Sequence, residues 1–96
     1  MAKAKQVRVL VRTVNAGVHY GTLVSRKGSE VVLADARRLW RWYGAVTLSE
    51  VSVSGIDAAR SRVAVPVKSI TLLGVIEVIP CEAKACASIE GAAWAP

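Results

Sequence analysis

Residues 35–45 read DARRLWRWYGA, from Asp35 to Ala45. This segment contains two of the three tryptophans and one of the two tyrosines, in a chain that has no phenylalanine. Three arginines, Arg37, Arg38 and Arg41, belong to the same segment. Because large aromatic side chains dominate the apolar area of small cores and of interfaces, most of that area lies here. We expect strands to lead into this segment and later elements to pack around it.

The first predicted strand covers residues 6–13, QVRVLVRT. Its residues alternate with a period of two, with Val7, Val9 and Val11 on one side. This alternation in β-branched residues is typical of a strand with one buried face.

Two further strands are predicted before the aromatic segment. Residues 18–25 form one strand, in which Gly21 indicates a bulge or a close approach by another backbone. A hairpin turn at residues 26–29 leads into the third strand over residues 30–34. The three strands predict an antiparallel meander.

The aromatic segment itself has an ambiguous local structure. Asp35 is suited to cap a single helical turn, and Gly44 breaks the run that follows. Trp40 and Trp42 cannot both face the same side together with Leu39. The sequence therefore leaves open whether the two tryptophans belong to the core or to an interface.

A short helix is predicted after this segment. Thr47 and Glu50 match the S/T-x-x-E capping box, and Gly55 lies where a helix commonly ends. The predicted helix covers residues 48–53, although the valines of this stretch also suit a strand. Residues 57–62 are polar and are predicted to form a loop.

The remaining chain predicts more strands and a terminal helix. Residues 62–67 alternate again, and residues 70–79 form one or two strands interrupted at Gly74. Residues 82–90 favour a helix through their alanines. We expect Trp94 to fold back as an anchor.

These elements predict a single domain over residues 1–96, with a flexible basic N-terminus at 1–5 and a C-terminal tail at 92–96. The expected fold is mainly β: a small antiparallel meander that closes into a partly open barrel or a bent sheet, with one or two short helices. Such a meander leaves strand edges exposed, and exposed edges favour association between copies.

The basic charge is concentrated in the first half of the chain. Residues 1–42 contain nine lysines and arginines against two carboxylates, whereas residues 43–96 contain four against five. A basic half attracts phosphates, acidic protein surfaces or other anions, unless its side chains are only the solvated faces of strands. No apolar run is long enough to span a bilayer, and residues 1–5 are not followed by a signal-peptide core, so we expect a cytoplasmic site of synthesis.

Catalytic and metal-binding signals are weak. Cys81 and Cys86 are too few for a disulfide framework, and with His19 they cannot complete a four-ligand zinc site. We interpret them as small buried or half-buried thiols and His19 as a packed or surface residue. The carboxylates show none of the spacings that group acids and bases. We therefore expect no enzymatic activity and no cofactor.

The strongest candidate site is the aromatic–basic segment. Guanidinium groups bind phosphates and acidic groups, and aromatic rings stack on bases or anchor interfaces. The opposing interpretation is that the tryptophans are core anchors and the arginines lie along them. The predicted binding or docking residues are Arg37, Arg38, Trp40, Arg41, Trp42 and Tyr43.

Three stretches of the chain resemble a family of small uncharacterised proteins of tailed bacteriophages and prophages. They are VRTVNAGVHYGTL, EVVLADARRLWRWYGAVTLSEVSVSGI and VIEVIPCEAKACASIEGAAW, of which ARRLWRWYGA is the most distinctive part. The resemblance implies a non-enzymatic accessory or minor structural protein of the virion, which acts by self-association and by docking to other virion proteins. The alternative is a phage protein of the host cytoplasm that binds nucleic acid or a signalling nucleotide through residues 37–43.

Overall fold

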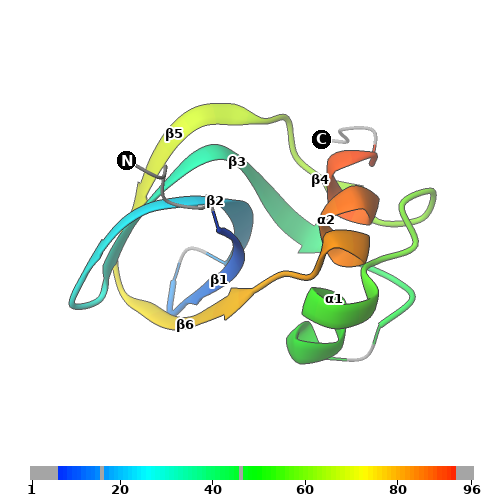
Figure 1. The fold of residues 1–96 in the computed structure, drawn as a ribbon, viewed down its shortest axis with the longest axis horizontal. Helices are drawn as coiled ribbons and strands as arrows, with labels where there is room; N and C mark the ends of the chain where they lie inside the picture. Colours follow the sequence, from blue (N-terminus) through cyan, green and yellow to red (C-terminus); the bar gives the residue numbers. More distant parts are fainter. Residues whose placement is uncertain (1–6, 16, 46, 93–96) are drawn as a thin grey trace, which may run out of the picture.

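The computed structural model describes residues 7–15, 17–45 and 47–92. Over these residues the protein is mainly β, with one antiparallel sheet of six strands and two short helices (Figure 1). The elements are β1 (Arg8–Thr13), β2 (Val18–Lys27), β3 (Glu30–Arg41), α1 (Leu48–Ser54), β4 (Arg62–Val63), β5 (Val67–Leu72), β6 (Val75–Pro80) and α2 (Ala83–Glu90). The predicted β meander with short helices is confirmed.

The sheet bends around its first strand but does not close. Its strand order is β4-β3-β2-β1-β6, and β5 pairs with the first half of β3. β5 and β6 follow each other across a turn at Gly74, yet they pair with β3 and β1 respectively. Within the described residues no hydrogen-bonded ladder joins β5 to β6. The predicted bent sheet is therefore correct, and the described strands stop short of a closed barrel.

The bent sheet separates two apolar cores. The inner core is built by strands alone, from Val9, Val11, Val31, Leu33, Ala36 and Leu72. On the other face of the sheet, α1 and α2 cover a second core that includes Leu10, Tyr20, Leu39, Val51, Cys86 and Ile89. We call it the helix-covered core.

Strand β1 is buried on both faces, contrary to the single buried face predicted for it. Val9 and Val11 enter the inner core, whereas Leu10 between them enters the helix-covered core. All three are at most 1% exposed. The two helices cause the difference, because they cover the face of β1 that the alternation assigned to solvent.

Gly21 marks a close approach and a bulge, as predicted. A Cβ atom at this position would lie 3.0 Å from the carbonyl oxygen of Ala34 and 3.1 Å from the Cβ of Leu33. The pairing of β2 with β3 also shifts register between Tyr20 and Thr22. The missing side chain therefore allows the two strands to cross closely.

Strand β3 includes the first half of the aromatic segment, so the predicted helical turn at Asp35 is wrong. The strand continues to Arg41 because it has partners on both sides: β2 on one, and β5 and then β4 on the other. Asp35 instead adopts a left-handed conformation with φ of 50°. This residue is the extra residue of a β-bulge in β3. Aspartate tolerates the left-handed conformation better than most residues do.

This bulge changes which side chains of β3 face each core. Before it, Val31 and Leu33 point into the inner core, and Ala36 continues that row after it. Leu39 instead lies in the helix-covered core. Arg37 is two residues before Leu39 and shares its face, since side chains in a strand alternate. The bulge thus directs Arg37 towards the helices.

Helix α1 begins and ends as the capping signals predicted. The Thr47 hydroxyl accepts a hydrogen bond from the Glu50 backbone N–H at 3.2 Å, and Gly55 follows with φ of 85°. The strand alternative for this stretch is wrong. The backbone N–H of Glu82, just before α2, donates to the Ser52 carbonyl at 2.9 Å and links the two helices.

The C-terminal helix was predicted at 82–90 and is found at Ala83–Glu90. Ala92, placed in the predicted tail, is buried. Trp94 and the predicted flexible terminus at 1–5 lie outside the described residues.

None of the helices in the described part of the chain is long and apolar enough to cross a membrane.

The bulge generates a stability prediction. Replacing Asp35 by valine places a β-branched residue at positive φ, and we expect the free energy of unfolding to fall by at least about 1–2 kcal/mol. Asp35→Asn is the matched control, because asparagine tolerates the left-handed region, and it should stay close to the wild type. Urea denaturation measures both variants, and equal stabilities would contradict a conformational role for this residue.

Candidate functional site

The structure places the six predicted site residues in three environments. Arg37 is buried at 6% exposure, whereas Arg38, Trp40 and Arg41 are exposed. Trp42 is half-buried and packs against the helix-covered core, and Tyr43 is also half-buried. The sequence left open whether the two tryptophans are core or interface residues. In the structure Trp42 packs against the core, whereas Trp40 is on the surface.

Arg37 holds the C-terminal end of α2 against the sheet. Its Nε donates to the Ala64 carbonyl at 2.9 Å, and its Nη1 donates to the carbonyls of Ile89 and Ala92 at 3.0 and 2.8 Å. The last carbonyls of a helix lack partners within the helix, and a cation there also suits the helix dipole. The guanidinium is therefore committed to backbone carbonyls and is separate from the exposed arginines.

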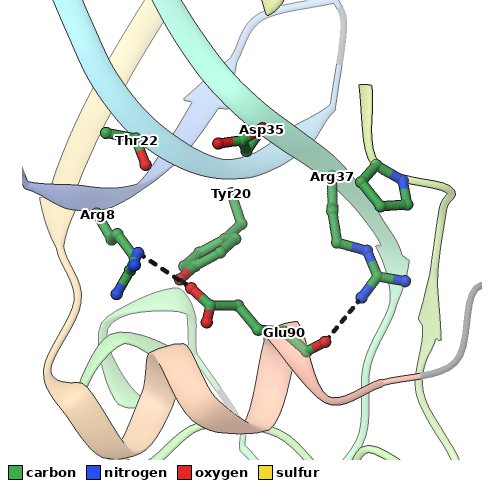
Figure 2. Close-up of a pocket in the computed structure, with 7 residues that line it drawn as sticks. Arg8, Tyr20, Thr22, Asp35, Arg37 and Glu90 are labelled. Carbon is green, nitrogen blue, oxygen red and sulfur yellow. Dashed lines mark hydrogen bonds and ion pairs between the residues drawn. The ribbon is translucent and has the colours of Figure 1, made fainter. Parts of the chain in front are cut away.

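A cavity of about 330 Å³ lies beside Arg37, between the sheet and the end of α2 (Figure 2). Glu90 accepts a hydrogen bond from the Tyr20 hydroxyl and pairs with Arg8, whose Nε lies 3.1 Å from its carboxylate. Figure 2 shows Thr22 and Asp35 on the opposite side of the cavity from Glu90. The lining side chains are Arg8, Tyr20, Thr22, Asp35, Arg37, Pro66 and Glu90.

The charges of this cavity balance. Two arginines oppose two carboxylates, Glu90 is already paired with Arg8, and Arg37 is bound to carbonyls. Burial, followed by hydrogen bonds to Cys86 and Glu90, raises the pKa of Tyr20, so its hydroxyl keeps its proton and remains a donor. We interpret the cavity as part of the joint that fixes α2 on the sheet, since it has no excess charge to attract an ion.

The exposed cations form a different surface at the far end of β3. We call it the arginine–aromatic face, and it consists of Arg38, Trp40, Arg41, Tyr43, Arg60 and Arg62. These residues come from two neighbouring stretches, the end of β3 and the turn that leads into β4. The Tyr43 backbone joins them, because its N–H donates to Ser61 Oγ at 2.9 Å and its carbonyl accepts from the Asp57 N–H at 2.8 Å.

Both rings of this face are in contact with an arginine. The guanidinium carbon of Arg62 lies 5.6 Å from the centroid of the Trp40 ring, and that of Arg60 lies 4.5 Å from the centroid of the Tyr43 ring. Trp40 remains 47% exposed. Cation–π contacts orient these guanidinium groups along the rings while leaving their N–H donors available for an anion.

The backbone pairing places like charges opposite each other. Arg41 pairs with Arg62, after a register shift that sets both Trp40 and Arg41 against Arg62. Like charges directly opposite across two strands destabilise a sheet. The ion pairs Arg8–Glu90 and Arg12–Glu77 lie elsewhere in the protein. An anion bound between Arg41 and Arg62 would relieve the repulsion.

Sequence reasoning missed Arg60 and Arg62. They are isolated basic residues in a stretch predicted as a loop, and only the pairing of β3 with β4 brings them beside Trp40 and Tyr43. Their spacing, Arg-Ser-Arg, was the available signal, but it does not specify a partner strand. The turn that carries Arg60 is held by Asp57, whose Oδ1 accepts a hydrogen bond from the Ala59 N–H at 3.2 Å.

The other titratable candidates are packed side chains. His19 is 1% exposed within β2, and both cysteines are free thiols. Burial, with a smaller contribution from Cys86, raises the pKa of the Cys81 thiol from 9.0 to about 12. Among the described residues no three His, Cys, Asp or Glu side chains gather in a way that could hold a metal ion.

These features define a class: a small, bent antiparallel β protein with two covering helices and an exposed arginine–aromatic face. A family model described as "Domain of unknown function (DUF6948)" matches residues 6–89, and the chain belongs to this family. The matched region contains the whole arginine–aromatic face. No curated protein matches the chain, and no solved structure matches it.

The two neighbouring arginines, Arg37 and Arg38, should respond differently to substitution. Arg37→Ala leaves several buried carbonyls without donors, and we expect the free energy of unfolding to fall by about 3–5 kcal/mol. Arg38→Ala changes an exposed side chain and should stay within about 0.5 kcal/mol of the wild type. Chemical denaturation of both variants measures the difference. A tolerated Arg37→Ala would remove its proposed role at the end of α2.

The thiol of Cys81 should be unreactive near neutral pH. In the Cys86→Ser variant, which retains Cys81 as the single thiol and keeps the burial that is the largest cause of its raised pKa, we expect alkylation of the folded protein to begin at a clearly higher pH than alkylation of the unfolded chain. The unfolded chain releases this proton near 9.0, so it binds fewer protons than the folded chain between pH 9.0 and about 12, and stability should fall across that interval. Iodoacetamide rates in folded and urea-unfolded protein provide the comparison; a folded-state midpoint near 9 would contradict it.

Proposed function

We propose that this protein is a non-enzymatic binding module that holds single-stranded nucleic acid on its arginine–aromatic face. One observation carries the proposal: Arg60 and Arg62 contact the rings of Tyr43 and Trp40, and two more exposed arginines, Arg38 and Arg41, lie at the same end of β3, with Arg41 set directly opposite Arg62. A surface of this kind is complementary to a chain of phosphates that also carries flat rings. The net charge of +6 adds a general attraction for such a polyanion.

The shape of the face favours a single strand over a duplex. Reading a duplex in its major groove requires a helix or a two-stranded ribbon that protrudes into the groove. Here α1 and α2 are short and bury their apolar sides in the helix-covered core. Trp40 offers a ring for stacking only to bases that are not already stacked in a duplex. We therefore assign the arginines to phosphates and Trp40 to a base.

A second candidate function is docking to copies of itself or to other virion proteins, as the phage resemblance implies. It is favoured by exposed apolar side chains at the opposite end of β3, where Leu73 is 68% and Ile76 is 55% exposed. The Val14 N–H donates to the Gly74 carbonyl at 3.0 Å, so the β1–β2 turn lies against the β5–β6 turn there. This end can associate with a partner while the arginine–aromatic face stays open. The proposed location is the virion for the docking function and the host cytoplasm for nucleic-acid binding.

Binding is tested with an Arg38→Ala, Arg41→Ala, Arg62→Ala triple variant and a labelled single-stranded oligonucleotide. Fluorescence anisotropy over a range of salt concentrations should show at least about tenfold weaker binding, and a salt slope smaller by about 2, because each phosphate contact contributes about 0.7 for single strands. The matched control is Arg26→Ala, Lys27→Ala, Lys84→Ala, which removes the same charge from exposed positions elsewhere.

Equal affinities of the two triple variants would show that only net charge matters and would reject the assigned face. If the wild type does not bind the oligonucleotide, the docking function becomes the better proposal. Sedimentation of the wild type and of a Leu73→Ser, Ile76→Ser variant would then report on self-association.

A further inference from the structure

A second cavity lies on the face of β3 opposite to Arg37. Its volume is about 190 Å³, and its walls are mostly apolar: Ala36, Ala64, Val65, Val67 and Ile70. These walls come from β3, from β5 and from the segment between β4 and β5. The cavity is thus formed where the two partner strands of β3 separate.

Two polar side chains complete the cavity at different depths. His19 is almost fully buried and belongs to its floor, whereas Arg38 is exposed and belongs to its rim. The two residues are paired across β2 and β3. The cavity therefore leads from a guanidinium at the surface to an imidazole in the interior, between apolar walls.

The cavity is continuous with the arginine–aromatic face through Arg38. Trp40 follows Arg38 by two residues along β3, and the Ala64 N–H of the cavity wall donates to the Arg38 carbonyl at 2.8 Å. A nucleotide whose phosphate contacts Arg38 therefore has both the Trp40 ring and the mouth of the cavity within reach. The rim charge complements the phosphate, and the apolar walls complement a flat ring.

The size of the cavity limits its occupant. Pockets for drug-sized ligands enclose roughly 300–1,000 Å³. A cavity of about 190 Å³ is too small for a whole nucleotide but suits a single ring system. Proteins that take a base out of its stack enclose it between apolar side chains and contact its polar edge with hydrogen-bonding groups.

We infer that this cavity receives one base of the strand bound on the arginine–aromatic face, with His19 at the polar edge of the base and Arg38 on its phosphate. This inference rests on the proposed function and adds to it a base-binding subsite. The strand would then be held by phosphate contacts along the face, by stacking on Trp40 and by one base inserted between β3 and the β4–β5 segment.

The test separates the cavity from the face. Ala64→Leu fills the cavity, and Ala64→Ser is the control of nearly unchanged size. Both are titrated with an intact single-stranded oligonucleotide and with an abasic strand of the same length. We expect Ala64→Leu to weaken binding of the intact strand by about 5- to 100-fold, the range for one stacked base, without altering the abasic affinity or the salt slope.

The possible failures are distinguishable. If Ala64→Leu binds the intact strand as tightly as Ala64→Ser does, or loses the abasic strand equally, the base subsite is rejected while binding on the face stands. If the wild type binds neither strand, the proposed function fails as well. Should Ala64→Leu not fold, Val67→Trp fills the cavity from its exposed rim, and the same outcomes apply.

Discussion

The architecture depends on the bonds that Arg37 makes at the end of α2. The guanidinium reaches the carbonyl of Ala64, beyond β4, and those of Ile89 and Ala92 at the end of α2. It thereby joins the sheet, the short β4 strand and the C-terminal helix at one buried point. A buried cation is stable only when its donors are satisfied, and here carbonyls that the helix cannot satisfy itself accept them. This joint closes the helix-covered core.

The bulge at Asp35 gives two neighbouring arginines opposite roles. Side chains alternate along a strand, so Arg37 and Arg38 point to different faces of β3. The extra residue determines which of them faces the helices. Arg37 becomes part of the internal structure, and Arg38 becomes part of a surface with Trp40, Arg41 and the arginines beside β4. The left-handed residue in β3 therefore places Arg38 on the proposed ligand surface, and the pairing of β3 with β4 completes that surface.

Local signals in the sequence predicted the elements that local interactions form. The capping residues of α1, the close approach at Gly21 and the C-terminal helix all appear where they were expected. The aromatic segment was misread after Asp35, because the isolated stretch offers a helix cap and no information about partners. Pairing on both sides of β3 outweighs that local preference. The burial of both faces of β1 and the contribution of Arg60 and Arg62 depend on elements distant in the chain, which no local pattern reveals.

The sequence by itself determined the β class, the single set of short strands and the two helix positions, since periodicity, capping and composition are local properties. Only the tertiary structure decided that Trp42 packs against the core while Trp40 is exposed, that Arg37 is internal, and that Arg60 and Arg62 complete the surface. The physical reason is strand pairing, because the register and bulges of β3 set the direction of every side chain that the strand contributes to the segment. The strands that pair with β3, which are β2, β4 and β5, are distant from the segment in the sequence.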